Sequence, residues 1–198
     1  MSNKTVVVGM SGGVDSSVSA YLLKKQGFNV IGLFMKNWQS EPGEVCSSEI
    51  DFQDASEVCD ILDIPLHKAN FSDDYWDRVF KQFLSEHKKG RTPNPDILCN
   101  REIKFKSFYD YALKIGADFI ATGHYAKVEN NNGEAKLYRS KDINKDQTYF
   151  LHEVSSKEFS KTIFPLSGLY KSEVRDIAKE LNLNIHSKKD SVGICLSL

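Results

Sequence analysis

The segment Gly9-Met-Ser-Gly-Gly-Val-Asp-Ser-Ser17 has the residue types of a phosphate-binding turn. It follows an apolar, β-branched run and precedes a helical pattern. Two consecutive glycines allow a tight turn that aims several backbone N–H groups at one point, and the helix start adds partial positive charge. The segment lacks the lysine of a Walker loop and the third glycine of a dinucleotide fingerprint. We therefore predict a nucleotide-phosphate site; the structural alternative is a turn in which Asp15 caps the helix.

An aspartate inside a phosphate-binding turn requires a nearby cation, because a carboxylate and a phosphate repel each other. Magnesium is a hard cation that prefers carboxylate and phosphate oxygens. We expect Asp15 to face Mg²⁺.

Two cysteines lie in basic surroundings. Cys99 is within the segment from Arg78 to Lys106, where eight lysines and arginines against three acids give a net charge of +5, and Cys195 follows Lys188 and Lys189 closely. Such surroundings lower a thiol pKa and favour the reactive thiolate. Together with a nucleotide site they indicate sulfur chemistry. The alternatives are a pair of inert buried cysteines or, less favoured by the spacing, a four-cysteine zinc site.

The other two cysteines have no comparable setting. Cys59 falls on the apolar face of a predicted helix and is expected in the core, whereas Cys46 lies in a loop whose position the pattern does not define.

Strands and helices alternate along the first 122 residues. Buried strands are predicted over residues 4–8, 29–35, 66–70 and 119–122, and helices over 16–26, 51–62, 72–86 and 104–115. This rhythm predicts an α/β fold, a parallel sheet with helices on both faces. Residues 88–100, with two prolines and no periodicity, are predicted as a loop that carries Cys99. A hairpin over 126–128 and 135–138 and a helix over 171–181 follow.

Length and composition restrict the class of protein. At 198 residues and a net charge of −1, the chain has no apolar run near the ~20 residues of a membrane span and no secretory signal. The expected compartment is the cytoplasm. We expect two parts, a nucleotide-binding catalytic domain over 1–165 and the start of a further binding or linker region over 166–198. Because the chain stops within the apolar segment after Asp190, we expect it to be truncated at its C-terminus.

The motif S-G-G-V-D-S resembles the pyrophosphate loop (PP-loop) of the ATP pyrophosphatases, which cut ATP between the α- and β-phosphates. The order of the further motifs Asn94-Pro-Asp96, Cys99-Asn100, Thr122-Gly-His-Tyr125, Lys145-Asp-Gln147 and Gly193-Ile-Cys195 resembles that of bacterial tRNA-specific 2-thiouridylases. The three residues after Cys195 depart from the pattern, since Leu-Ser-Leu stands where Phe-Ile-Gly is usual. The resemblance implies an adenine-nucleotide α-hydrolase-like fold, ATP with Mg²⁺, and sulfur transfer to C2 of the wobble uridine of tRNA.

The resemblance also implies roles for individual residues. ATP contacts are expected from Gly9, Met10, Ser11, Gly12, Gly13, Val14, Asp15, Ser16, Met35 and Gly123. Contacts to the target base are expected from Asn94, Pro95 and Asp96, and further tRNA contacts from His124, Lys145, Asp146 and Gln147. Cys99 is similar to the nucleophile and Cys195 to the thiol that carries a persulfide, with a Cys99–Cys195 disulfide as one outcome. Asp96 is a candidate proton shuttle, and a turn-capping role for it is equally open.

The expected partners are tRNA and a sulfur-relay protein or cysteine desulfurase that donates the persulfide, with no membrane. Two other functions remain open: an amide-forming ATP pyrophosphatase such as a GMP synthetase, and a non-catalytic nucleotide- or RNA-binding module. Tyr149 and Phe150 have the chemistry to stack on a base, but we predict that they lie in the core.

Overall fold

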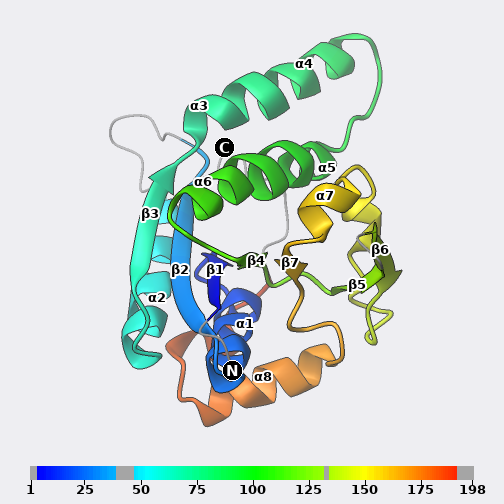
Figure 1. Ribbon diagram of the computed structural model, residues 1–198. Coiled ribbons are helices and arrows are strands. Elements are labelled where there is room, and N and C mark those ends of the chain that lie inside the picture. The colour runs from blue at the N-terminus through cyan, green and yellow to red at the C-terminus, as the bar shows by residue number, and fades with distance from the viewer. Residues whose placement is uncertain (1–3, 39–46, 132–133, 191–198) are drawn as a thin grey trace.

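The computed structural model describes residues 4–38, 47–131 and 134–190 of the chain (Figure 1). Its centre is a five-stranded sheet with the order β3-β2-β1-β4-β7, in which every neighbouring pair is parallel. The strands are β1 (Thr5–Met10), β2 (Asn29–Lys36), β3 (Leu66–Asn70), β4 (Phe119–Ala121) and β7 (Thr162–Ile163). The predicted parallel sheet is confirmed; the two-residue β7 was not predicted.

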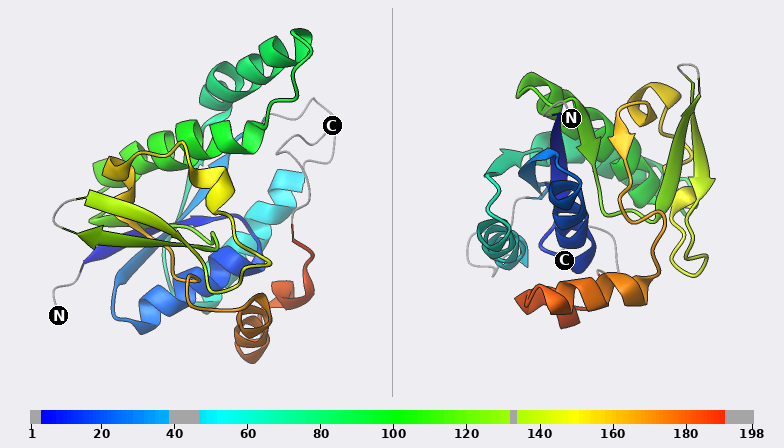
Figure 2. Two further views of the ribbon diagram at one scale, coloured as in Figure 1. Left: turned by 90° about the vertical axis from the view of Figure 1, so that its right-hand side faces the viewer. Right: turned by 60° about the horizontal axis from the view of Figure 1, so that its bottom comes forward.

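Helices cover both faces of this sheet, as predicted. One face carries α1 (Val14–Lys25), α2 (Ser47–Ile61) and α8 (Lys171–Glu180). The other face carries α3 (Ser72–Tyr75), η1 (Trp76–Phe80), α4 (Lys81–Lys88), α5 (Pro95–Cys99), η2 (Asn100–Ser107) and α6 (Phe108–Lys114). Figure 2 shows α8 beneath α1, on the side of the sheet away from α6.

The β1 strand shows why two layers of helices are needed. Val6 and Val8 point into the core on the α1 side, whereas Val7 points into the core on the α6 side, and all three are fully buried. Successive side chains of a strand face opposite sides, so an unbroken apolar run requires both faces to be covered.

The predicted loop over residues 88–100 is wrong in its second half. Asn94 accepts a hydrogen bond from the backbone N–H of Asp96 at 3.0 Å and caps α5, with Pro95 in the first helical position. Proline fits there because the first N–H groups of a helix have no partner within it. Cys99 therefore lies at the end of a helix, not in a loop, and the π-helix η2 continues directly from it.

The smaller elements lie after β4. The predicted hairpin is confirmed as the antiparallel pair β5 (Ala126–Asn131) and β6 (Glu134–Arg139). It is followed by η3 (Thr148–Leu151), α7 (Ser156–Phe159) and, after α8, η4 (Asn184–Ser187).

Residues of the predicted second part pack in the same core as α1. Val174, Ala178, Leu183 and Ile185 are buried with Val14 and Val18. The boundary between residues 165 and 166 thus stays a prediction, and the packing across it is extensive. Within the described ranges, no helix is both long and apolar enough to cross a membrane.

Candidate functional site

The loops after β1 and β4 open at the same edge of the sheet. From β1 the chain moves outward to β2 and β3, and then returns to place β4 on the other side of β1. This change of direction is a topological switch point, where open α/β sheets bind ligands outside the carboxyl ends of the strands. The phosphate loop (residues 9–17) follows β1, and Gly123 follows β4.

The backbone of the phosphate loop leaves the start of α1 open. Gly12 has φ +70°, and a Cβ there would lie 2.3 Å from the carbonyl oxygen of Asp51, so the turn requires glycine. Gly13 is the N-cap and supplies no side-chain capping bond. The first helical N–H groups are therefore directed out of the helix without an internal partner, as an anion site requires.

Two serine hydroxyls fix the shape of this turn. The hydroxyl of Ser16 donates to the carbonyl of Gly13 at 3.1 Å and accepts from the backbone N–H of Ser11 at 3.2 Å. The hydroxyl of Ser17 donates to the same carbonyl at 2.8 Å. Ser16 and Ser17 are buried and shape the loop, whereas Ser11 is exposed and its hydroxyl lies 3.2 Å from that of Ser16.

The two remaining predicted ATP contacts outside the loop lie against it. A Cβ on Gly123 would be 2.8 Å from both the carbonyl carbon of Asp15 and the backbone nitrogen of Ser16. A Cβ on Gly9 would be 3.2 Å from the terminal methyl of Met35. The structure therefore brings the predicted ATP residues together at one sheet edge, and their contacts to a nucleotide stay predictions.

Asp15 is held by two side chains from distant parts of the chain. The ammonium of Lys171 donates to both carboxylate oxygens, at 2.7 and 2.8 Å, and the hydroxyl of Tyr125 donates to Oδ1 at 3.0 Å. Burial and the charge of Asp15 raise the pKa of Tyr125, so Tyr125 keeps its proton. Neither Tyr125 nor Lys171 was predicted as part of the site.

The arrangement around Asp15 does not fit a magnesium ion held by the protein. Its oxygens already accept hydrogen bonds from Lys171 and Tyr125, and the described residues contain no group of three or more potential metal ligands. Asp15 as a magnesium ligand stays a prediction, which this geometry does not favour, and we derive no step through the metal.

Cys99 is buried, with 3% of its surface exposed. Six of the eight cations counted around it are ion-paired, and the two of these nearest to it in sequence show how: Arg101 pairs with Glu102 and Glu153, and Lys106 pairs with Glu102. The sequence count overlooked Glu153, which lies outside the counted window, so the positive charge near Cys99 is lower than predicted. Cys46 and Cys195 lie outside the described residues.

Cys59 is confirmed as a core residue. It is 1% exposed, and burial together with Asp60 raises the pKa of its thiol to about 12.

The four predicted tRNA contacts that lie outside α5 and its cap have partners within the chain. His124 is buried, its Nδ1 lies 2.8 Å from the Thr122 hydroxyl, and burial, reinforced by Lys104, lowers its pKa well below 6.5. The side chain of Gln147 accepts from the backbone N–H of Tyr125, and Lys145 donates to Asp190 at 2.8 Å.

Asp146 completes this motif. It accepts from the backbone N–H of Ser140 and from the hydroxyl of Thr148, so its carboxylate orders the turn between β6 and η3. The roles of all four residues toward tRNA stay predictions.

Tyr149 is exposed, contrary to the prediction that it lies in the core. Its exposed fraction is 64%, and its ring packs edge-on against Phe150 at 5.4 Å between centroids. The carbonyl of Phe150 accepts from the side-chain Nδ2 of Asn100 at 3.0 Å, which ties η3 to the residue that follows Cys99. An exposed aromatic ring is thus placed beside the helix that carries Cys99.

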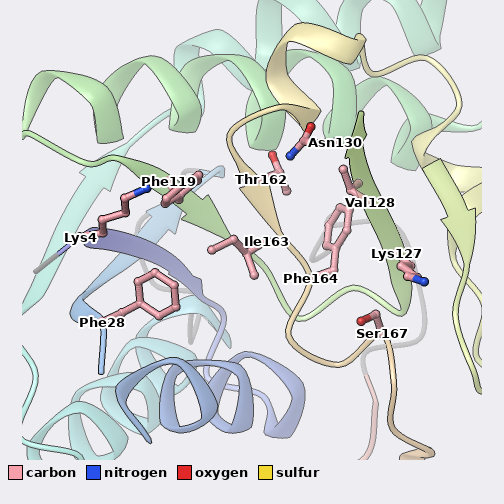
Figure 3. Close-up of a pocket in the computed structure, with 10 residues that line it drawn as sticks. All are labelled: Lys4, Phe28, Phe119, Lys127, Val128, Asn130, Thr162, Ile163, Phe164 and Ser167. Carbon is pink, nitrogen blue, oxygen red and sulfur yellow. The ribbon is translucent and has the colours of Figure 1, made fainter. Parts of the chain in front are cut away.

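A cavity of about 440 Å³ lies away from this edge, between the start of β1, β5 and β7 (Figure 3). Phe28, Phe119 and Phe164 dominate its lining, which contains no carboxylate, histidine or cysteine. None of its lining residues belongs to the phosphate loop, so we do not assign the nucleotide site to it.

The chain matches a known family along almost its whole length. The family model described as "tRNA methyl transferase HUP domain" matches residues 4–197. The chain belongs to this family. The tRNA-specific 2-thiouridylase MnmA 1 of Geobacillus kaustophilus is 58% identical to this chain, over 98% of this chain and 53% of the relative. The MnmA protein of Nitrosomonas eutropha is 60% identical over 98% of this chain and 54% of the relative.

The predicted resemblance to bacterial 2-thiouridylases is confirmed by these relatives. The chain spans about half the length of the curated relatives it matches.

Solved structures support the fold assignment. A 4-thiouridine synthetase–RNA complex with bound ATP superimposes with a TM-score of 0.61 and 22% identity, over 94% of this chain and 43% of the other. The U34-tRNA thiolase NcsA of Methanococcus maripaludis superimposes with a TM-score of 0.59 and 22% identity, over 98% of this chain and 61% of the other. At this identity the likeness shows the fold alone, and it confirms the predicted α/β fold with a parallel sheet.

Proposed function

We propose that this protein uses ATP to transfer sulfur to C2 of the wobble uridine of tRNA. The observation that carries the proposal is the phosphate loop, open at a switch point, in a chain 58–60% identical to 2-thiouridylases. A nucleotide-binding module without chemistry would explain the loop but not the similarity to sulfur-transferring enzymes.

In the first step, uridine O2 attacks the α-phosphate of ATP, and the bond to pyrophosphate breaks. The N–H groups at the start of α1 and the Ser11 hydroxyl bind the departing pyrophosphate. These donors are fixed before the reaction, because the Ser16–Gly13 and Ser17–Gly13 hydrogen bonds hold the turn. Donors that need no reorganisation stabilise developing charge most effectively. The step converts O2 into part of a good leaving group, AMP.

In the second step, the terminal sulfur of a persulfide on Cys195 attacks C2, and AMP leaves. If Cys99 attacks Cys195, the products are thiolated uridine and a Cys99–Cys195 disulfide, which a thiol reductant must then reopen. In the other version Cys99 first bonds to C2 and AMP leaves. The terminal sulfur of the persulfide then displaces Cys99 from C2, and Cys99 attacks the sulfur of Cys195, which releases 2-thiouridine and the same disulfide. Four residues lie between Asp190 and Cys195, and the five Cα-to-Cα steps from one to the other span at most about 18 Å. Asp190 is tied to the phosphate loop through Lys171, which supports an approach of Cys195 to the site.

The base would lie against α5. Asp96 is in the first turn of α5, three residues before Cys99, and residues at this spacing share a helix face. Asp96 can therefore accept or return a proton near the thiol. Tyr149 offers an exposed ring for stacking on a base, an interaction that contributes ~1–3 kcal/mol.

The test is mass spectrometry of nucleosides from tRNA incubated with the protein, ATP and either a cysteine desulfurase or a sulfur-relay protein carrying a persulfide. We expect 2-thiouridine from the wild type and none from the Cys99→Ser and Cys195→Ser variants. Cys59→Ser is the matched control, because that thiol is buried and protonated. Full thiolation by either of the first two variants would refute the two-thiol scheme.

A further inference from the structure

We propose that Lys171 is the positioning residue of the phosphate loop: it neutralises Asp15 in place of a metal ion and holds the first turn of α1. The inference rests on the proposed nucleotide site and assigns a role to a residue 156 positions away from the loop. It answers the question why an anion-binding turn contains a carboxylate.

The ammonium of Lys171 uses its three donors on two carboxylates. It lies 2.7 and 2.8 Å from the two oxygens of Asp15 and 2.7 Å from Oδ1 of Asp190. Its side chain is only 11% exposed, so water screens these pairs weakly. A charged group buried to this degree requires partners, and Lys171 has them from both sides.

Lys171 is held in place by its own helix. Its backbone N–H donates to Asp142 at 2.9 Å, and Glu173 accepts from the backbone N–H of Tyr170 in a capping box. Val174 and Ala178 of the same helix pack in the core with α1. The ammonium is therefore fixed relative to α1 before any ligand binds.

The same ammonium connects the loop to a second ion pair. Asp190 also accepts from Lys145 at 2.8 Å and from Arg175 at 3.3 Å. Partial burial acts to raise the pKa of Asp190, but the hydrogen bonds from Lys145 and Lys171 lower it to about 2. A chain of alternating charges thus runs from Asp15 to Lys171, Asp190 and Lys145.

Without Lys171, the carboxylate of Asp15 would repel a bound phosphate. We expect Lys171→Met to weaken binding of α,β-methylene-ATP by about 100-fold, since like charges a few ångströms apart interact strongly at a half-buried site. The double variant Lys171→Met/Asp15→Asn removes the repelling charge as well and should regain most of the affinity. Lys171→Arg keeps the charge, and Lys179→Met, at an exposed position of the same helix, is the matched control.

Calorimetric titration with α,β-methylene-ATP, and separately with inorganic pyrophosphate, measures these affinities. A double variant that binds no better than Lys171→Met would overturn the proposal, as would a Lys171→Met variant that binds like the wild type. Titrating Mg²⁺ distinguishes the metal hypothesis. If Asp15 were a metal ligand, Asp15→Asn would raise the Mg²⁺ concentration needed for nucleotide binding. That result would also overturn the proposal that Lys171 takes the place of a metal ion.

Thermal unfolding without nucleotide gives an independent readout. We expect Lys171→Met to lower the unfolding midpoint by leaving Asp15 unpaired, and the added Asp15→Asn change to restore part of it. Additive effects of the two changes would refute the pairing. If the wild type binds neither probe, the proposed function fails, whereas this cycle still decides whether Lys171 acts through Asp15.

Discussion

Replacing Gly123 by alanine places one methyl group against the backbone of the phosphate loop. The new Cβ would lie 2.8 Å from the carbonyl carbon of Asp15 and from the backbone nitrogen of Ser16, and 3.0 Å from the Asp15 Cβ. These atoms belong to the first turn of a packed helix and cannot move aside as a flexible side chain would. Either β4 or the start of α1 must shift.

The expected cost follows from this overlap. Forcing an extra carbon into a packed site costs about 1–3 kcal/mol, which for a domain of this size lowers the unfolding midpoint by roughly 2–12 °C. Nucleotide binding should fall more than stability, because the shifted atoms include an N–H group directed at the predicted phosphate. Gly168→Ala is the control, since a Cβ there meets nothing within 4 Å.

The assay pairs thermal unfolding with calorimetric titration of α,β-methylene-ATP. We expect Gly123→Ala to lose most of its affinity and Gly168→Ala to match the wild type in both measurements. Wild-type affinity in Gly123→Ala would show that the turn after β4 does not govern the phosphate loop, and the site geometry argued above would be wrong.

Two further predictions concern stability. Because His124 is buried and neutral in the fold, only the unfolded chain protonates this side chain as the pH falls below 6.5. The free energy of unfolding should therefore fall by up to about 1.4 kcal/mol for each pH unit toward acid. The His124→Asn variant should show a flatter dependence on pH in denaturant titrations. An equal slope in both proteins would contradict the assignment. Asn94→Ala should lower the free energy of unfolding by about 1 kcal/mol because it removes the cap of α5, whereas Asn94→Asp should keep it because aspartate caps equally well. Chemical denaturation measures both variants. Equal losses of stability in the two would show that the side-chain cap contributes nothing.

Features that depend on neighbouring residues could be predicted from the sequence. The phosphate loop was found because its glycines and serines lie between a strand pattern and a helix pattern. Strands β1, β2 and β4 can be predicted because their apolar runs are continuous. Strand β3, which contains His67, Lys68 and Asn70, has no such run and follows from its place after a helix pattern and Pro65.

What depends on distant contacts could not be predicted. Lys171 reads as the first residue of an ordinary amphipathic helix, and nothing near it in the sequence indicates Asp15. Glu153 lies outside any window drawn around Cys99, so the count of charges there was too positive. Strand β7 has only two residues, too few for a periodic pattern.

The start of α5 does have a local signal in the sequence. Asn94 followed by Pro95 is typical of a helix start, yet two prolines in a short segment favoured a loop. Tyr149 shows a different limit: a pair of aromatic residues has the composition of a core, and only the fold shows which of the two rings faces solvent.

The packing of α8 against α1 has a consequence for synthesis on the ribosome. The outer surface of α1 is complete early, but Val174, Ala178, Leu183 and Ile185, which cover it, are translated some 150 residues later. At ~5–20 residues per second that delay is roughly 8–30 s. During this interval the nascent chain exposes the apolar surface of α1. We therefore expect a chaperone to bind α1 until residue 171 and those after it have emerged.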